Sequence, residues 1–374
     1  MSSPLNPYTR LTIIASSRIL TVMPYMVWEF SKYFFIGLIG AAIWVVPLIE
    51  LLYKLKFVFQ QENVGSWNAI FRKIAKTKVG TPSLGGILIW LTVTAVWLFI
   101  NTPFARAAAV VFFLIGLYGF VEESFTQFFV KRSKELRLWY EKFSTRMGKL
   151  AVMMLLYAFV VRIIIGFLGV THTYLFGIKI PLVAGSLLGS AVLFVGLLIA
   201  VFISSYSTEI IDGVDGLAAG LYIITLLGYT LLAFAYPASF KIGGGHFMTA
   251  MIGALIGALV VYLYFNIPPA RVFMGSPGAL PMGAIFLIFS LYTDTMEAFI
   301  FFIAIYVVDF LTSALQILSM KLRGKRIFPI APIHHYFQHK GWPDAKVTMR
   351  AWLLQFVMVM LGVLVQIWVN TYLR

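Results

Sequence analysis

Ten apolar stretches recur along this 374-residue chain, and each is long enough to cross a bilayer or nearly so. No soluble core requires 61% hydrophobic residues, and only 11% of the residues are charged. We therefore predict an all-α integral membrane protein, with about ten transmembrane helices in a single polytopic domain over residues 1–374. The predicted spans are 33–53, 86–104, 107–121, 149–169, 187–205, 217–236, 249–266, 278–293, 297–319 and 350–371.

The residues before the first span have a different character. Their apolar pattern at 11–30 is interrupted by Arg18, Pro24 and Glu29. The segment lacks the basic start, the unbroken apolar run and the small-residue cleavage site of a signal peptide. We expect residues 1–32 to form an interfacial N-terminal segment.

The basic residues predict how the chain is oriented. Most of the 29 Lys and Arg residues lie in the loops that follow the odd-numbered spans. By the positive-inside rule these loops face the cytoplasm, and ten spans then put both termini on the extracytoplasmic side. The net charge of +15 thus comes mostly from basic residues that orient the chain in the membrane, which argues against nucleic acid as a partner. With no cysteine, the chain has no disulfide framework and no thiolate metal site.

The five predicted cytoplasmic loops carry nearly all of the distinctive polar motifs. Each motif alone has an ordinary structural explanation, such as a glycine-rich turn, a capping aspartate or a solvated helix end. Their concentration on one face of one membrane domain instead indicates a site there. The motifs are KVGTPSLGG (78–86), Glu122-Glu123, STEIIDGVDG (207–216), FMGSPGA (273–279) and APIHHYFQHKGWPDAKV (331–347).

This combination of charges suits a reaction between a soluble anion and an anion held in the membrane. Lys78 can neutralise phosphate charge. Carboxylates can hold Mg2+, which commonly bridges protein oxygens and substrate phosphates. We therefore predict active-site loops on the cytoplasmic face, where catalysis consists mainly of positioning and charge neutralisation.

Taken in order, the motifs resemble the phospho-N-acetylmuramoyl-pentapeptide transferases, within the polyprenyl-phosphate N-acetylhexosamine-1-phosphate transferase superfamily. The resemblance runs from LTVMPYMVWEF (20–30) through GTPSLGG, DGVDGLAAG and FMG to APIHHYFQHKGWP, which is the most specific motif. It implies transfer of phospho-N-acetylmuramoyl-pentapeptide from its UDP donor to undecaprenyl phosphate, with release of UMP. It also implies Mg2+ as cofactor, a multi-pass location in the bacterial plasma (inner) membrane, and a homodimer.

The resemblance further implies roles for individual residues. It puts Lys78 and Ser83 near the nucleotide, Asp212 and Asp215 in the nucleoside pocket, and Phe273 beside the uracil. His334 and His335 are implied to contact the sugar nucleotide. The implied catalytic acids are Glu122, Glu123 and Asp212.

The chain departs from the family at the acids themselves. Glu122-Glu123 replaces an Asp-Asp pair, and Ser276 stands where the family has its metal-ligand aspartate. A neutral hydroxyl lacks the attraction of a carboxylate for a divalent cation. Glu209, on the neighbouring loop, is a candidate to supply the missing charge. The expected metal site therefore comprises Glu122, Glu123, Glu209 and the position of Ser276.

Three functional hypotheses remain open. One is an active, Mg-dependent phosphoglycosyl transferase with a rearranged metal site. The second is a catalytically inactive homologue that binds UDP-sugar or polyprenyl phosphate and has a regulatory or assembly role. A transporter is the weakest, because Arg162 and Asp309 are the within-span candidates and two such residues are too few for a relay.

Overall fold

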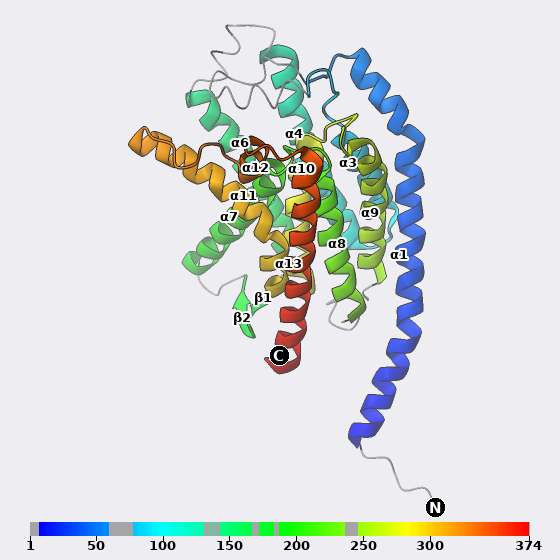
Figure 1. Ribbon diagram of the computed structural model, residues 1–374. Coiled ribbons are helices and arrows are strands. Elements are labelled where there is room, and N and C mark those ends of the chain that lie inside the picture. Colours follow the sequence, from blue (N-terminus) through cyan, green and yellow to red (C-terminus); the bar gives the residue numbers. More distant parts are fainter. Residues whose placement is uncertain are drawn as a thin grey trace, which may run out of the picture.

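The computed structural model describes residues 7–59, 78–130, 135, 138, 143–166, 172–182, 187–235 and 246–373. This part of the chain is almost entirely helical (Figure 1). The helices are α1 (Pro7–Lys54), α3 (Gly86–Phe99), α4 (Pro103–Phe125), α6 (Phe143–Gly166), α7 (Leu187–Ile210), α8 (Leu217–Ala235), α9 (His246–Asn266), α10 (Ser276–Thr293), α11 (Met296–Arg323), α12 (Ile333–His339) and α13 (Asp344–Tyr372). A π-helical turn, η2 (Thr126–Val130), continues α4.

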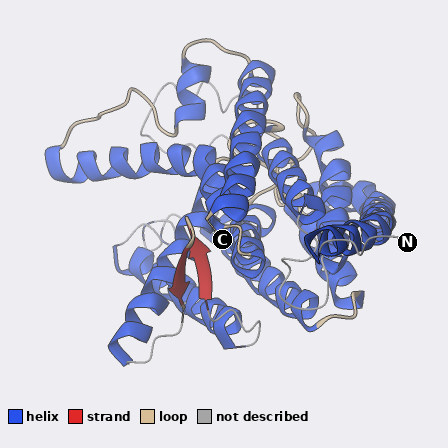
Figure 2. Ribbon diagram, turned by 90° about the horizontal axis from the view of Figure 1, so that it is seen from below, coloured by secondary structure: helices blue, strands red, loops and turns tan. Residues whose placement is uncertain are grey.

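Two short strands form the only sheet among the described residues. Strands β1 (His172–Leu175) and β2 (Ile178–Pro181) pair antiparallel, with His172 opposite Pro181. Phe176 and Gly177 link them, and both have positive φ, as the tight turns of hairpins require. Figure 2 shows this hairpin as the two red arrows near the C-terminal end.

Nine of the described helices are long and apolar enough to cross a membrane, so the prediction of an integral membrane protein is supported. The remaining predicted span, 86–104, is the 14-residue apolar helix α3. At 1.5 Å per residue it is about 21 Å long, against about 30 Å for the hydrocarbon layer. Helix α1 begins and α13 ends at the same end of the molecule (Figure 1).

The boundary between the second and third spans was predicted wrongly. The chain leaves helix at Ile100, and the next helix begins at Pro103. Thr102 has extended backbone, and its side chain accepts a hydrogen bond from the Ala105 amide at 3.1 Å. This is an N-cap followed by proline at the first helical position, a strong start signal inside an apolar run. Helix α4 is therefore 23 residues long instead of the short span 107–121.

Helix α1 is continuous from Pro7 to Lys54, so the predicted N-terminal segment shares a helix with the first span. Lys32 and Glu29 form an ion pair at 2.7 Å one turn apart on this helix. Pairing lowers the cost of carrying two charges in a largely apolar helix. The interfacial location of residues 1–32 stays a prediction.

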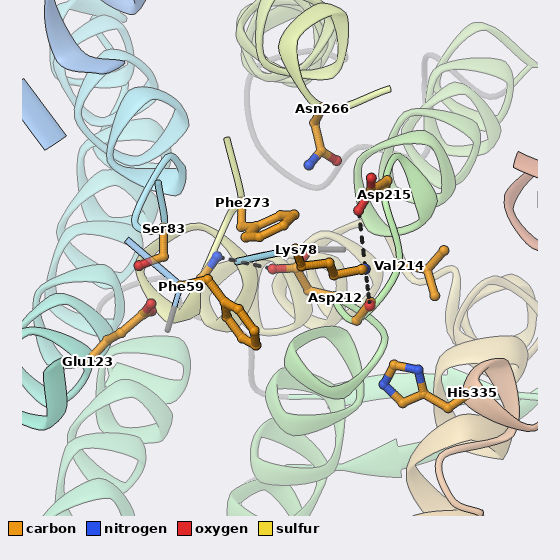
Figure 3. Close-up of a pocket in the computed structure, with 12 residues that line it drawn as sticks. Phe59, Lys78, Ser83, Glu123, Asp212, Val214, Asp215, Asn266, Phe273 and His335 are labelled. Carbon is orange, nitrogen blue, oxygen red and sulfur yellow. Dashed lines mark hydrogen bonds and ion pairs between the residues drawn. The ribbon is translucent and has the colours of Figure 1, made fainter. Parts of the chain in front are cut away.

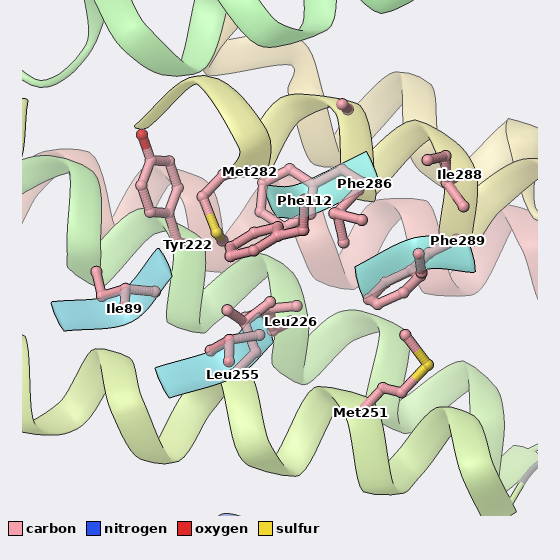
Figure 4. Close-up of a cluster of buried hydrophobic side chains, with 14 of the residues drawn as sticks. Ile89, Phe112, Tyr222, Leu226, Met251, Leu255, Met282, Phe286, Ile288 and Phe289 are labelled. Carbon is pink, nitrogen blue, oxygen red and sulfur yellow. The ribbon is translucent and has the colours of Figure 1, made fainter. Parts of the chain in front are cut away.

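Helix α10 lies at the centre of the molecule, and its residues from Pro277 to Thr293 are all buried. It packs against α3, α4, α7 and α11. Figure 4 shows Phe286 and Phe289 of this helix among Phe112, Tyr222 and other large apolar side chains. A helix that is apolar on every side is expected to occupy this kind of position.

Helices α1 and α9 approach so closely that side chains are excluded between them. A Cβ on Gly257 would lie 2.1 Å from the Phe34 carbonyl oxygen, and one on Gly253 would lie 2.4 Å from that of Phe30. On α1, a Cβ on Gly37 would lie 2.2 Å from the Ala254 carbonyl oxygen. Small residues four apart allow such backbone contact in membrane helices.

We predict that Gly257→Ala lowers the thermal stability of the protein in detergent. The added methyl meets backbone of α1, which cannot rotate away, so a loss of about 1–3 kcal/mol is expected. Thermal unfolding of the purified variant measures the effect. Gly196→Ala is the matched control, because Gly196 lies within α7 and a Cβ there meets nothing within 4 Å. Equal melting temperatures for the two variants would contradict the close contact.

Candidate active site

Three segments far apart in the sequence form one wall of a cavity through backbone hydrogen bonds. The Phe59 amide donates to Thr81 O, and the Phe273 amide donates to Pro82 O, both at 2.8 Å. The Gly85 and Gly86 amides donate to Phe273 O and Met274 O at 2.7 and 2.8 Å. The GTPSLGG and FMGSPGA motifs are thus bonded directly to each other.

The glycines of these motifs permit that contact. A Cβ on Gly86 would lie 2.5 Å from the Gly278 amide nitrogen, so neither position leaves room for a side chain. Gly275 has φ +71°, a conformation that favours glycine. The turn at Gly275 directs the first amides of α10 toward the cavity wall.

The cavity has a volume of about 280 Å³, and its lining includes Gly275, the residue directly before α10. Seven of the eleven predicted site residues line it, and Figure 3 shows how their side chains lie relative to one another. The seven are Lys78, Ser83, Glu123, Asp212, Asp215, Phe273 and His335. The other four, Glu122, Glu209, Ser276 and His334, lie outside the set that lines this cavity.

Lys78 crosses the cavity and contacts both acidic and aromatic groups. Its Nζ donates to Gly213 O at 2.9 Å and lies 3.1 Å from Asp215 Oδ1 and 3.5 Å from Asp344 Oδ2. The same nitrogen lies 5.5 Å from the centre of the Phe273 ring. The lysine side chain is only 13% exposed, so its charge is balanced locally by two carboxylates.

Three carboxylates from different elements converge on the first residues of α10. The Ser276 amide donates to Glu123 Oε2 at 2.9 Å, and the Ser276 hydroxyl donates to Glu209 Oε1 at 2.6 Å. The Gly275 amide donates to Asp212 Oδ2 at 3.0 Å. Backbone amides and the positive end of the helix dipole stabilise negative charge here. Glu209 therefore reaches the position of Ser276, a contact that the sequence left open.

Glu122 and Ser83 contact residues outside the group of acids at the start of α10. Glu122 forms an ion pair with Lys149 at 3.5 Å, and its side chain is 31% exposed. The Gln127 side-chain amide bridges two residues, donating to Ser83 Oγ and to Glu123 Oε1. Adjacent positions on α4 thus face different surroundings, since Glu123 lines the cavity and Glu122 does not.

The acids suit an Mg2+ site whose ligands come partly from the protein and partly from substrate and water. They do not form a complete set of protein ligands. Within the described residues, no three His, Cys, Asp or Glu side chains are arranged as a ready-made metal site. Mg2+ in phosphate-binding sites commonly uses one or two carboxylates, with water and substrate phosphates completing its octahedron. Glu123, Glu209 and Asp212 each bond to Gly275 or Ser276, so carboxyl oxygens are available near the start of α10 for that mode.

Burial shifts the pKa of two groups in the cavity wall. Burial raises the pKa of Asp212 to about 8, with the Glu123 and Glu209 charges adding to it and the Gly275 amide and Lys78 opposing it. Burial, and then the neighbouring His334, lowers the pKa of His335 well below its ordinary range. His335 is therefore neutral at physiological pH.

The two histidines of α12 lie against each other beside Gly213. Their ring centres are 4.1 Å apart, and His335 Nδ1 lies 2.5 Å from Gln338 Oε1. Gln338 Nε2 donates to Asp344 Oδ1 at 2.6 Å, and the other oxygen of Asp344 faces Lys78. Two hydrogen bonds and one ion pair thus connect His335 to Lys78.

The sequence did not single out several residues of this site. Asn266 lines the cavity and bonds to both Gly216 N and Val272 O, and a buried amide at the end of an apolar span was a usable signal. Asp344 was visible as an acid at the start of the last helix. Phe59 packs edge-on against Phe273 with ring centres 6.1 Å apart, and no local pattern distinguishes it.

The fold and the cavity define a multi-pass membrane protein with a buried lysine and clustered carboxylates facing one polar cavity. The sequence model of Glycosyl transferase family 4 matches residues 106–294, which is half of the chain, and the protein belongs to this family.

Its relatives identify the branch. A phospho-N-acetylmuramoyl-pentapeptide-transferase of Heliobacterium modesticaldum is 32% identical over 348 residues, which cover 91% of this chain and 98% of the relative. Proteins with the same name from Staphylococcus aureus and Chlamydia muridarum are each 29% identical, over 91% and 90% of the chain. The resemblance inferred from the motifs is thereby confirmed.

We predict that Asp212→Asn stabilises the metal-free protein at high pH. The pKa of Asp212 is about 8 in the fold against an ordinary 3.8, so the folded state retains a proton that the unfolded state releases between these values. Stability contributed by this group is therefore lost as pH rises from about 4 toward 8. An asparagine oxygen still accepts from Gly275 without carrying charge.

Thermal unfolding in EDTA at several pH values measures this effect. The melting temperature of Asp212→Asn should exceed that of the wild type at pH 8–9, and the difference should shrink toward pH 5. A difference that does not vary with pH would show that the Asp212 carboxyl titrates normally.

Proposed function

We propose that the protein transfers phospho-N-acetylmuramoyl-pentapeptide from its UDP donor to undecaprenyl phosphate. A phosphate oxygen of the lipid attacks the sugar-linked phosphorus of the donor, the pyrophosphate bond breaks, and UMP leaves. The observation that carries the proposal is the convergence of seven predicted residues on one cavity, with Lys78 among them. The names of the relatives support the same reaction.

Lys78 and two aromatic rings form the part of the cavity suited to the nucleotide. Phe273 and Phe59 pack edge to face, and a planar base can stack on either ring. Lys78 Nζ is within reach of Phe273 and of three oxygen acceptors. A bound diphosphate competes with these acceptors for the ammonium group, which then neutralises charge on the departing UMP.

Glu123, Glu209 and Asp212 are the residues proposed to hold Mg2+. When bound, the ion neutralises the charge of the pyrophosphate and orients its oxygens. The chain positions these carboxylates through Ser276 N, Ser276 Oγ and Gly275 N. Ser276 is thus proposed to orient Glu209 and not to act as the principal ligand. Glu122 was also predicted as a ligand; because it pairs with Lys149, we place it further from the ion in this proposal.

A second, apolar cavity supports a lipid as the other substrate. It has a volume of about 660 Å³ and lies between α11, α12 and α13. Ile305, Val308, Leu354 and Met358 are among its apolar lining residues, and His334 is part of its wall. His334 also abuts Gly213, which lines the polar cavity. An apolar site next to a phosphate site suits an acceptor whose phosphate is attached to an isoprenoid chain.

The proposal extends to location and assembly. Bacterial relatives and the apolar helices support a multi-pass protein of the bacterial plasma (inner) membrane. The donor is soluble, so it approaches from the cytoplasm, and both termini then face the opposite side. A homodimer is part of the same proposal and rests on the family resemblance alone.

A second candidate is a catalytically inactive homologue that binds UDP-sugar or polyprenyl phosphate, with a regulatory or assembly role. The specific observation in its favour is the neutral Ser276, whose hydroxyl is already engaged with Glu209. Such a protein would keep Lys78, Phe273 and His335 around a nucleotide cavity and lack turnover.

We predict that loss of the Glu209 carboxylate strongly reduces activity and that a carboxylate introduced at position 276 restores part of it. Glu209→Gln removes a metal-binding carboxylate and should reduce UMP release at least 100-fold, because charge neutralisation dominates this type of catalysis. Glu209→Gln with Ser276→Asp returns a carboxylate to the same point, where the glutamine amide can donate to it. Activity of the double variant should recover by 10-fold or more.

The assay is UMP release by purified protein with UDP-N-acetylmuramoyl-pentapeptide and undecaprenyl phosphate, in Mg2+ and in EDTA. Glu50→Gln is the control, because it neutralises an exposed glutamate on α1 away from the cavity. No turnover by the wild type, with UMP binding that survives EDTA, would reject the transferase and favour the inactive homologue.

A further inference from the structure

Asp309 is a fully buried carboxylate within the membrane-spanning helix α11, and its contacts connect it to the cavity wall. Its Oδ2 lies 2.7 Å from His334 Nδ1, and its Oδ1 accepts the His334 backbone amide at 3.2 Å. The exposed fractions of the two side chains are 1% and 4%. An ionisable group inside a membrane span is costly unless it is paired, and the partner of Asp309 is one histidine of α12.

This geometry bears on which nitrogen of His334 carries a proton. An ionised carboxylate is only an acceptor, and both oxygens of Asp309 face nitrogen atoms of His334. When Asp309 is ionised, Nδ1 donates to it, and a neutral ring then has its lone pair on Nε2. Holding both the backbone and the ring of one residue also fixes the orientation of the imidazole.

His334 Nε2 is the unusual atom of the pair. It is buried and has no hydrogen-bond partner among the described residues. An unsatisfied buried polar atom destabilises the folded protein, and a bound ligand that bonds to it removes that cost. Its direction is defined by Gly213, since a Cβ there would lie 2.4 Å from His334 Nε2 and 3.1 Å from His335 Nε2.

Gly213 lies beside this nitrogen, also lines the polar cavity, and is itself held by a cavity group. Gly213 lines the cavity, and its carbonyl accepts from Lys78 Nζ at 2.9 Å. A ligand phosphate that takes Lys78 releases this carbonyl. Without that bond, no cavity side chain in the part of the chain that the structure describes holds the Gly213 carbonyl in place beside Nε2.

We propose that Asp309 is a positioning residue, which holds His334 with its proton on Nδ1 so that Nε2 accepts a hydrogen bond from the sugar-nucleotide donor. The group recognised is a hydroxyl or an amide N–H, because phosphate oxygens cannot donate to a lone pair. This inference rests on the proposed function for the identity of the ligand. The tautomer itself is independent of that function.

The first test reads the tautomer directly by 15N NMR of the full-length protein labelled at histidine. Protonated and unprotonated ring nitrogens give widely separated resonances, and His334→Gln identifies the signals among the five histidines. The wild type should show His334 protonated at Nδ1. In Asp309→Asn the amide nitrogen can face Nδ1, which moves the proton to Nε2. A wild-type ring protonated only at Nε2, or a pattern unchanged in Asp309→Asn, would overturn the proposal.

The second test asks whether the tautomer matters for the donor. Asp309→Asn should lower kcat/KM for UMP release on the order of 10- to 100-fold, as expected for loss of a hydrogen bond in a buried site. Asp309→Glu, which restores a carboxylate acceptor, should recover part of this loss. Unchanged transfer in a variant whose tautomer has inverted would reject the positioning role.

Thr312→Val is the matched control, because Thr312 Oγ1 donates to the Asp309 carbonyl oxygen one turn further along α11. It should leave both the His334 resonances and the transfer rate unchanged. If wild-type protein releases no UMP, the proposed function fails separately, and binding of UDP-N-acetylmuramoyl-pentapeptide is then compared in wild type and Asp309→Asn. Equal affinity would overturn the inference, and weaker binding by the variant would support it.

Discussion

The site depends on a backbone contact from which side chains are excluded. Gly86 and Gly278 touch, and hydrogen bonds from Gly85 and Gly86 to Phe273 and Met274 bind the start of α3 to the segment before α10. This contact fixes where α10 begins, and the first amides of α10 then collect carboxylates from α4, α7 and the loop after α7. The convergence of acids therefore follows from the packing of two glycine-rich turns, as well as from the acids themselves.

Much of the helical architecture could be predicted from the sequence, because apolar length is a direct consequence of bilayer thickness. The boundary near Thr102 could not, since apolar residues continue through it and only a local cap and Pro103 end one helix and begin the next. The burial of α10 was equally hidden. Its composition suits lipid as well as protein, and only its neighbours decide which surrounds it.

The candidate site, like the fold, could be predicted from the sequence only in part. Motif order identified Lys78, Asp215 and His335 because the family resemblance supplied their roles, and these residues do share one cavity. The contact between Glu209 and Ser276 spans 67 residues and depends on how α7 meets α10, which no local pattern encodes. The sequence places Asp309 inside a predicted span. Its bond to His334 could not be predicted, because that bond depends on how α12 packs against α11.

The ion pairs of Lys78 have a consequence for the binding of the proposed sugar-nucleotide donor. The ammonium group is already matched by Asp215 and Asp344, so an arriving diphosphate meets no surplus of positive charge. When the proposed donor binds, its diphosphate replaces Asp215 and Asp344 as the counter-ion of Lys78. The two displaced carboxylates then need another cation or a proton. Affinity in such a cavity should depend on ionic strength far less than it does on an open basic surface, where each contact releases ions to the solution.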